Sequence, residues 1–169
     1  MKPKAFDLEA YLPYLMNRAA VRFVAAIAPT LAEADVSLQE WRVLAALRQA
    51  QGQRVSDLAG MTSIDISTLS RTLNAMQRKG LIERRRPVVG DARVVTVHLT
   101  AAGETATEGI LPAAQRLETQ ALAGFTAAEA ATLKSMIERV YRNTAAAPAA
   151  QSAKGMEPSN AGLAEPTLK

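Results

Sequence analysis

A helix with a single apolar face is predicted over residues 66–79. Asp65 is placed to cap its first turn, and Gly80 follows as a residue suited to the end of a helix. Apolar residues recur at helical spacing and define the side that should be buried: Leu69, Leu73 and Met76. We interpret this stripe as part of a hydrophobic core and not as a cofactor site.

A β-hairpin is predicted immediately after that helix. Residues 81–86 alternate loosely between apolar and polar side chains, as a strand does. Residues 87–92 contain the proline and glycine of a turn, and residues 93–99 are rich in β-branched side chains. The segment therefore indicates a helix that leads directly into two antiparallel strands.

Shorter elements precede this unit. Ser37 and Glu40 form a capping box that opens a helix over residues 38–49. Its inward-facing residues are expected to be Trp41, Leu44, Ala45 and Leu47. Two short elements should follow it: a strand at residues 54–55 and a helix at residues 57–61 whose cap is Ser56. The order of helix, short helix, polar-faced helix and hairpin predicts a winged helix-turn-helix.

A long amphipathic helix is predicted before this unit, over residues 8–34. Pro13 should lie in its first turn or split off a short leading turn, and Pro29 should kink it near its end. Its apolar stripe consists of Leu8, Tyr11, Leu12, Leu15, Ala19, Phe23, Ile27 and Leu31.

Two further helices are predicted after the hairpin. Thr100 should cap a helix over residues 101–123 that Pro112 interrupts, and a second capping box at residues 126–129 opens a helix over residues 127–144. The inner face of the last helix comprises Ala130, Leu133, Ile137, Val140 and Tyr141. Neither the first nor the last helix has enough neighbouring chain to cover its apolar stripe in a monomer, which predicts a homodimer.

The expected fold class is mainly α with a small β-hairpin: a winged helix-turn-helix embedded in a helical dimerisation domain. Residues 1–36 would form the N-terminal dimerisation helix and residues 37–99 the winged helix-turn-helix. Residues 100–146 would form the C-terminal dimerisation helices. Residues 147–169, rich in Ala, Pro and Ser, are expected to form a disordered tail.

The positive charge is concentrated in the middle of the chain. Residues 54–93 contain eight basic and four acidic side chains, so this segment alone accounts for the chain's net charge of +4. Such a cluster is typical of a site for a polyanion. Taken by itself, the charge is equally compatible with a solvated basic surface that binds nothing.

Catalysis and tight metal binding are disfavoured by composition. The chain has no cysteine, and its single histidine, His98, alternates with core-facing valines and is interpreted as structural or surface-exposed. The sequence contains neither a nucleophile elbow nor a glycine loop that could cradle phosphate. We therefore expect no enzyme activity, cofactor or metal. We also expect a cytoplasmic location, because no apolar run could span a bilayer and the N-terminus lacks a signal peptide's apolar core.

A DNA-reading surface is predicted on the polar-faced helix and on the hairpin. The major groove admits one helix whose short polar or basic side chains reach base edges, and a narrow minor groove attracts arginine. The candidate contacts are Ser67, Thr68, Ser70, Arg71, Asn74, Arg78, Arg84, Arg86 and Arg93. Arg71 could instead be a solvated helix residue, and Arg93 an ordinary hairpin charge. Residues 84–86 cannot all face one way on a strand, so at least one arginine should pair internally, with Glu83 or Asp91.

Several stretches of the chain resemble the MarR family of winged helix-turn-helix transcriptional regulators. The similarity to the family's wing lies in three runs: Gly80-Leu81-Ile82-Glu83-Arg84-Arg85, Asp91-Ala92-Arg93 and Val97-His98-Leu99-Thr100-Ala101-Ala102-Gly103. The run Gln39-Glu40-Trp41-Arg42-Val43-Leu44 is similar to the helix that precedes the family's helix-turn-helix. The resemblance extends over about residues 8–144.

This resemblance implies an obligate homodimer that binds a pseudo-palindromic operator in double-stranded DNA, usually as a repressor relieved by a small ligand. It implies that residues 66–79 are the recognition helix, that Arg93 enters the minor groove, and that Asp91 orients Arg93. Asp91 could also simply form the turn. The family's cysteine-based peroxide sensors and its zinc sensors fit poorly, since their ligands are absent.

Candidate effector-binding residues lie mainly on the first helix. An aromatic acid needs an apolar slot and one cation, and the groups that could supply them are Tyr11, Tyr14, Asn17, Arg18, Arg22 and Trp41. The resemblance favours a small aromatic carboxylate or phenolic effector. Alternatively, Arg18 and Arg22 make structural ion pairs at the dimer interface, and Trp41 belongs to the core near a pocket wall.

Three functions remain open from the sequence. The first is a ligand-responsive repressor that binds DNA, and the second is a DNA-binding regulator without a small-molecule effector. The third is a winged-helix module for protein–protein assembly, for which the basic hairpin would be unnecessary.

Overall fold

The computed structural model describes residues 6–86 and 94–145. The chain divides after Ala123 into two units, residues 1–123 and 124–169. The described elements of the first unit are α1 (Leu12–Glu33), α2 (Leu38–Gln49), β1 (Gln53–Arg54), α3 (Val55–Thr62), α4 (Ile66–Arg78), β2 (Ile82–Arg85), β3 (Thr96–Leu99) and α5 (Ala101–Ala121). The second unit contains α6 (Ala127–Ala145).

Helix α1 begins at Leu12, four residues later than the sequence predicted. The Asp7 carboxylate accepts bonds from the backbone N–H groups of Glu9 and Ala10, and this local turn holds the preceding segment out of the helix. Pro13 lies in the first helical turn, as expected. Backbone N–H groups in the first turn have no acceptor within the helix, so the N–H that proline lacks is not missed there. Only Ile27 and Leu31 are buried in this helix, so most of its apolar stripe is exposed in the single chain.

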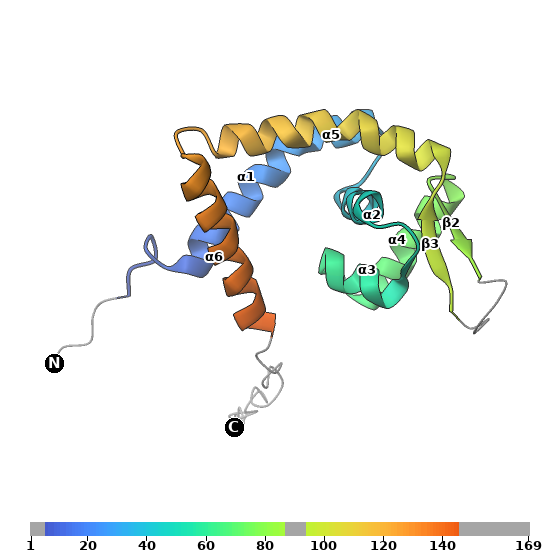
Figure 1. Ribbon diagram of the computed structural model, residues 1–169, viewed down its shortest axis with the longest axis horizontal. Coiled ribbons are helices and arrows are strands. Elements are labelled where there is room, and N and C mark those ends of the chain that lie inside the picture. The colour runs from blue at the N-terminus through green and yellow to red at the C-terminus, as the bar shows by residue number, and fades with distance from the viewer. Residues whose placement is uncertain (1–5, 87–93, 146–169) are drawn as a thin grey trace, which may run out of the picture. The chain divides into compact units, whose positions relative to one another are not determined.

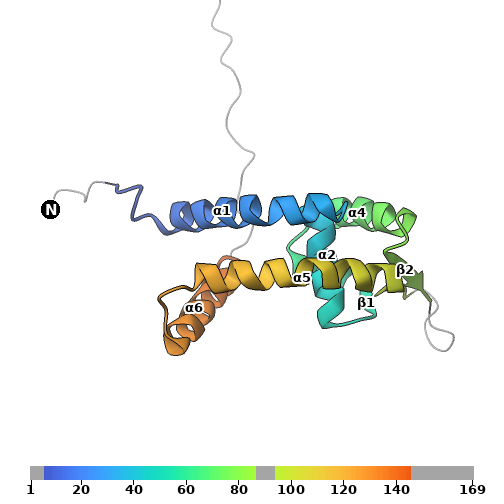
Figure 2. The same cartoon turned by 90° about the horizontal axis from the view of Figure 1, so that it is seen from above.

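Helices α1 and α5 lie side by side, and α2 packs against both of them (Figures 1 and 2). Helix α2 also contacts α3, α4 and β3, so it is the centre of the first unit. The core includes the fully buried residues Leu44, Leu47, Leu58, Leu69, Leu73, Met76, Ile82, Val97 and Ile110. The predicted apolar stripe of the polar-faced helix is thereby confirmed as core.

The strands form a three-stranded antiparallel sheet in the order β1-β3-β2. The two predicted strands of the hairpin are present but shorter than expected, at Ile82–Arg85 and Thr96–Leu99, and the predicted turn lies outside the described residues. We call β2, β3 and the residues between them the wing. Strand β1 lies one residue earlier than expected and pairs with β3.

Because the chain passes straight from β1 into α3, that helix starts at Val55. The expectation that Ser56 caps it is therefore wrong: its hydroxyl instead donates to Asp57 inside the first turn.

Two of the predicted helix caps are present, whereas one predicted helix break is not. Ser37 and Glu40 form the predicted capping box, and Thr100 caps α5 by accepting the N–H of Gly103. The predicted interruption at Pro112 is wrong, since α5 is continuous from Ala101 to Ala121. Pro112 is exposed and removes only one backbone donor, which a long, packed helix tolerates.

The junction between α4 and the wing is set by backbone bonds. Gly80 has φ +70°, which favours glycine, and the N–H of Leu81 donates to the carbonyl of Met76 at 2.9 Å. The Thr100 hydroxyl donates to the Gly80 carbonyl at 2.5 Å, which ties the end of the wing to the same turn. A Cβ at Gly103 would lie 2.0 Å from the Leu81 carbonyl oxygen, so only glycine lets α5 pack here.

An ion pair fixes the end of α4 to the start of α2. The Lys79 ammonium lies 3.3 Å from the buried carboxylate of Glu40 and donates to the Asp35 carbonyl at 2.6 Å. Desolvation lowers the pKa of Lys79, but the bonds and charges of Glu40 and Asp35 outweigh it, and the net pKa is raised. Lys79 is thus held as a cation in a structural contact.

Candidate nucleic-acid interface

Helix α4 presents a polar and basic surface opposite its buried stripe. Ser67, Arg71, Asn74 and Arg78 are exposed, while Thr68 and Ser70 are half-buried at the flanks. Leu69, Leu73 and Met76 are fully buried against the core. The structure therefore places four of the six sequence-predicted candidates of this helix on its outer side and the other two at the flanks of that side.

A carboxylate occupies the N-terminus of α4. Asp65 accepts the N–H of Thr68 at 2.9 Å and the hydroxyl of Ser67 at 2.6 Å. The Ser67 hydroxyl, followed by the Thr68 N–H, stabilises the charged form, so the pKa of Asp65 lies well below its ordinary value. Because Asp65 already neutralises the positive end of the helix dipole, this terminus is not a free phosphate site.

Arg71 lies along its own helix. Its guanidinium donates to the Ser67 carbonyl at 3.4 Å and to the Thr68 hydroxyl at 3.3 Å. Both bonds are long, and the side chain is exposed. Arg71 can therefore leave this position for a base or phosphate at little cost.

Arg84 connects the wing to α4. It lies opposite Val97 in the β2–β3 register and shares a strand face with Ile82, whose side chain is buried. Its guanidinium donates to the Asn74 Oδ1 at 2.8 Å and to the Gln77 Oε1 at 3.1 Å. Sequence reasoning treated Arg84 and Asn74 as separate contacts and missed Gln77. The available signal was that Gln77 follows Asn74 by three residues and so shares its helix face.

The neighbouring wing arginines differ in their surroundings. Arg85 pairs with Glu83, two residues earlier on the same strand face, which is one of the two internal pairings that were expected. Arg86 is exposed. Arg93 and Asp91 lie outside the described residues, as does the tail predicted for residues 147–169.

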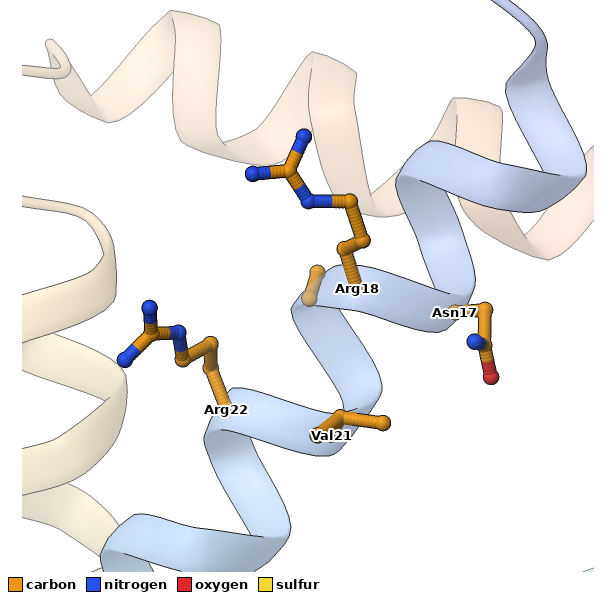
Figure 3. A pocket seen from close by; sticks show the side chains of 5 residues that line it. Asn17, Arg18, Val21 and Arg22 are labelled. Atoms are coloured by element: carbon orange, nitrogen blue, oxygen red, sulfur yellow. The ribbon is translucent and has the colours of Figure 1, made fainter. Parts of the chain in front are cut away.

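The candidate effector residues fall into separate places. A pocket of about 340 Å³ is lined by Asn17, Arg18, Ala19, Val21 and Arg22, all from α1. Arg18 and Arg22 extend to the same side of the helix (Figure 3). The Tyr14 ring lies under Arg18, 5.6 Å from its guanidinium carbon, and the Tyr11 ring packs on Phe6.

Trp41 is half-buried and lines a different pocket, of about 510 Å³, between α2 and α3. The other residues of that pocket are Arg42, Ala45, Ala46, Gln49, Met61 and Thr62. The six candidate effector residues are therefore not brought together in one cavity of the single chain.

The described part of the chain offers neither a cluster of metal-binding side chains nor a membrane-spanning helix. Residues 6–86 and 94–145 contain no group of three or more His, Asp or Glu side chains that could hold a metal ion. None of the helices in these ranges has the length and apolar composition needed to cross a membrane.

The chain is similar to known transcriptional regulators. The MarR family model matches residues 36–95. The multiple antibiotic resistance protein MarR of Escherichia coli K12 is 31% identical over 111 residues, which are 65% of this chain and 76% of that protein. A MarR-family regulator from Silicibacter pomeroyi has 30% identity and a TM-score of 0.73, covering 81% of this chain and 92% of its own.

The similar solved structures include a complex with operator DNA and a protein whose DNA binding is regulated by a small molecule. A mutant of E. coli MarR in complex with operator DNA has a TM-score of 0.69 and 26% identity, over 81% of this chain and 98% of its own. Bordetella bronchiseptica BpsR, whose DNA binding is regulated by 6-hydroxynicotinic acid, has a TM-score of 0.69 and 23% identity, over 82% and 99%. The predicted fold class, mainly helical with a small antiparallel sheet, is confirmed by these likenesses.

Proposed function

Because this chain belongs to the MarR family of transcriptional regulators, we propose that it binds a pseudo-palindromic operator as a homodimer and represses transcription until a small aromatic ligand releases it. The observation that carries the DNA-binding proposal is α4, whose apolar face is buried while its outer face is polar and basic. One such helix fits the major groove, and a symmetric dimer would place two of them in half-sites about 10 base pairs apart.

The helix and the wing are expected to read DNA differently. Arg93 is proposed to enter a minor groove, which reports groove width and A·T content more than sequence. Arg71 and Asn74 are proposed to face base edges in the major groove. Arg78, Arg84 and Arg86 add positive charge near the same surface.

This assignment is tested with binding titrations on a small operator library. Arg93→Ala should lose affinity on nearly every operator and change their ranking little. Arg71→Ala or Asn74→Ala should cost about 1–3 kcal/mol on the best site and relax preference at particular base pairs. Affinity should also fall steeply with salt, because phosphate contacts release counterions. Wild-type affinity in Arg93→Ala, or DNA binding that is flat in salt, would overturn the proposal.

Dimerisation is supported by apolar side chains that the single chain leaves exposed. On α1 these include Leu12, Leu15, Val21 and Phe23, and on α6 they include Met136, Ile137 and Tyr141. Exposing two such apolar stripes to water is unfavourable in free energy, and a second copy of the chain would cover them symmetrically.

The effector is proposed to be a small aromatic carboxylate or phenol bound at the α1 pocket. Arg18 and Arg22 supply cations and Asn17 a hydrogen-bonding amide, which suit a carboxylate. BpsR responds to 6-hydroxynicotinic acid, a hydroxylated aromatic carboxylic acid, and it shares this fold. All lining residues come from one helix, so we propose that the second copy supplies the opposite wall.

Release from the operator by hydroxylated aromatic carboxylates tests the effector proposal. 6-Hydroxynicotinic acid and its relatives should lower operator affinity, and Arg18→Gln with Arg22→Gln should weaken that response at least tenfold. Arg42→Gln, which alters the other pocket, is the matched control and should respond like wild type. If Arg42→Gln alone abolishes the response, the ligand binds between α2 and α3. If no acid in the set has an effect, the regulator acts without an effector of this class.

A further inference from the structure

Three exposed side chains form a bonded cluster where the wing meets α4. Arg84 projects from β2, and Asn74 and Gln77 project from one face of α4. Two nitrogens of the same guanidinium are used: Nη2 donates to the Asn74 Oδ1 and Nη1 to the Gln77 Oε1. We call these three residues the amide clamp.

Arginine chemistry fixes the orientation of both amides. A guanidinium has five N–H donors and no acceptor, so only an amide oxygen can face it. Each side-chain amide otherwise has two nearly equivalent orientations about its terminal torsion. Arg84 therefore selects the orientation in which both oxygens turn towards the wing and both NH₂ groups turn away from it.

We propose that Arg84 is a positioning residue that sets base preference by making Asn74 and Gln77 present N–H donors to the DNA. The inference rests on the proposed insertion of α4 into the major groove. Guanine offers two acceptors there, N7 and O6, and matches such donors. Adenine is read by a bidentate amide that must present both its oxygen and its nitrogen, and the clamp withdraws the oxygen. The operator pairs under the amide clamp should therefore carry guanine.

A phosphate contact by Arg84 is the competing role, and it makes a different prediction. Loss of a phosphate contact weakens all sequences equally and lowers the salt dependence by about one counterion. Loss of a positioning residue changes the ranking of sequences instead. Arg86 is the matched control, because it is an exposed arginine two residues further along the wing with the same charge.

The experiment first selects preferred operators for the full-length protein from randomised duplex DNA. Wild type, Arg84→Met, Arg86→Met and Asn74→Asp are then titrated against the selected operator and against versions with each guanine–cytosine pair changed to adenine–thymine. Wild type should favour guanine about tenfold at the positions under the clamp. Arg84→Met should lose most of that ratio, and Arg86→Met should keep it while weakening all duplexes.

A second variant tests the cluster from the helix side. Asn74→Asp keeps an oxygen for Arg84 but removes the NH₂ donor, so it should also lose the guanine ratio at one position. Adding Arg84→Met to Asn74→Asp should change that position no further. All these side chains are exposed, so melting temperatures should stay within a few degrees.

The possible outcomes distinguish a failure of the proposed function from a failure of the positioning role of Arg84. Failure to select any duplex would overturn the proposed function and this inference with it. A selected operator on which Arg84→Met weakens every sequence equally, or one with adenine under the clamp, would overturn the positioning role alone.

Discussion

The Asp65 side chain stabilises α4 and also disfavours phosphate binding at the N-terminus of that helix. Its carboxylate caps α4 through Thr68 and holds the Ser67 hydroxyl, which is itself a candidate DNA contact. The same charge lies at the N-terminus of α4 and repels phosphate. We therefore expect the proposed DNA contacts of α4 to come from its outer face and not from its N-terminus.

Asp65 should make the free energy of unfolding depend on pH. Its pKa is lowered in the folded protein, so its stabilising effect is fully present above the ordinary carboxyl pKa of 3.8 and is lost as pH falls towards the lower folded value. Asp65→Asn keeps an oxygen for the Thr68 N–H but cannot titrate. Thermal unfolding between pH 7 and pH 3 should show a smaller loss of stability in Asp65→Asn than in wild type. Ser67→Ala, which removes one donor to the carboxylate, should be intermediate. Equal pH slopes in all three proteins would contradict this role.

Among the elements, α5 depends on a close approach to the wing. Gly103 lies against the Leu81 carbonyl, and Thr100 bonds the turn between α4 and β2. Helix α4, the wing and α5 thus meet at one junction, so a displacement of α5 would also move the surface that we propose binds DNA.

Gly103→Ala should destabilise the protein by about 1–3 kcal/mol, because its methyl group would overlap a backbone oxygen that cannot move alone. Gly109→Ala is the matched control in the same helix, since nothing lies within 4 Å of a Cβ there. That change should be neutral or stabilise the helix by up to about 1 kcal/mol. Urea unfolding measures both differences. If Gly103→Ala is as stable as Gly109→Ala, the close approach does not exist in solution.

Across the whole molecule, charge and apolar surface are separated along the chain. The segment from Arg54 to Arg93 carries the net charge of +4, whereas uncovered apolar stripes lie on α1 and α6. A protein built in this way can bind DNA with one region and a second copy with others.

The dimer prediction concerns both ends of the chain. Protein truncated after Pro148 should remain a dimer by light scattering, because α6 is retained. Protein truncated after Gly124 lacks α6 and should aggregate or lose its fold. Full-length protein that is a stable, well-folded monomer at micromolar concentration would refute the proposed homodimer. A footprint of one asymmetric half-site on the operator would point the same way.

Local sequence patterns predicted a structural feature correctly where the residues that determine this feature are close in sequence. Helix α2, the Asp65 cap and the buried face of α4 depend on spacings of three or four residues, which can be read directly from the chain. The polar outer face of α4 follows from the same periodicity. For this reason the fold class and the surface proposed to bind DNA were both accessible before the structure.

Contacts between distant residues required the tertiary structure. The start of α3 depends on β1 pairing with β3, which lies more than 40 residues away. The clamp of Arg84 on Asn74 and Gln77, and the pair of Lys79 with Glu40, join different elements whose approach is set by core packing. Sequence spacing reports which side chains share a helix or strand face, but it does not report which faces meet. That depends on how the buried residues of all the elements pack together.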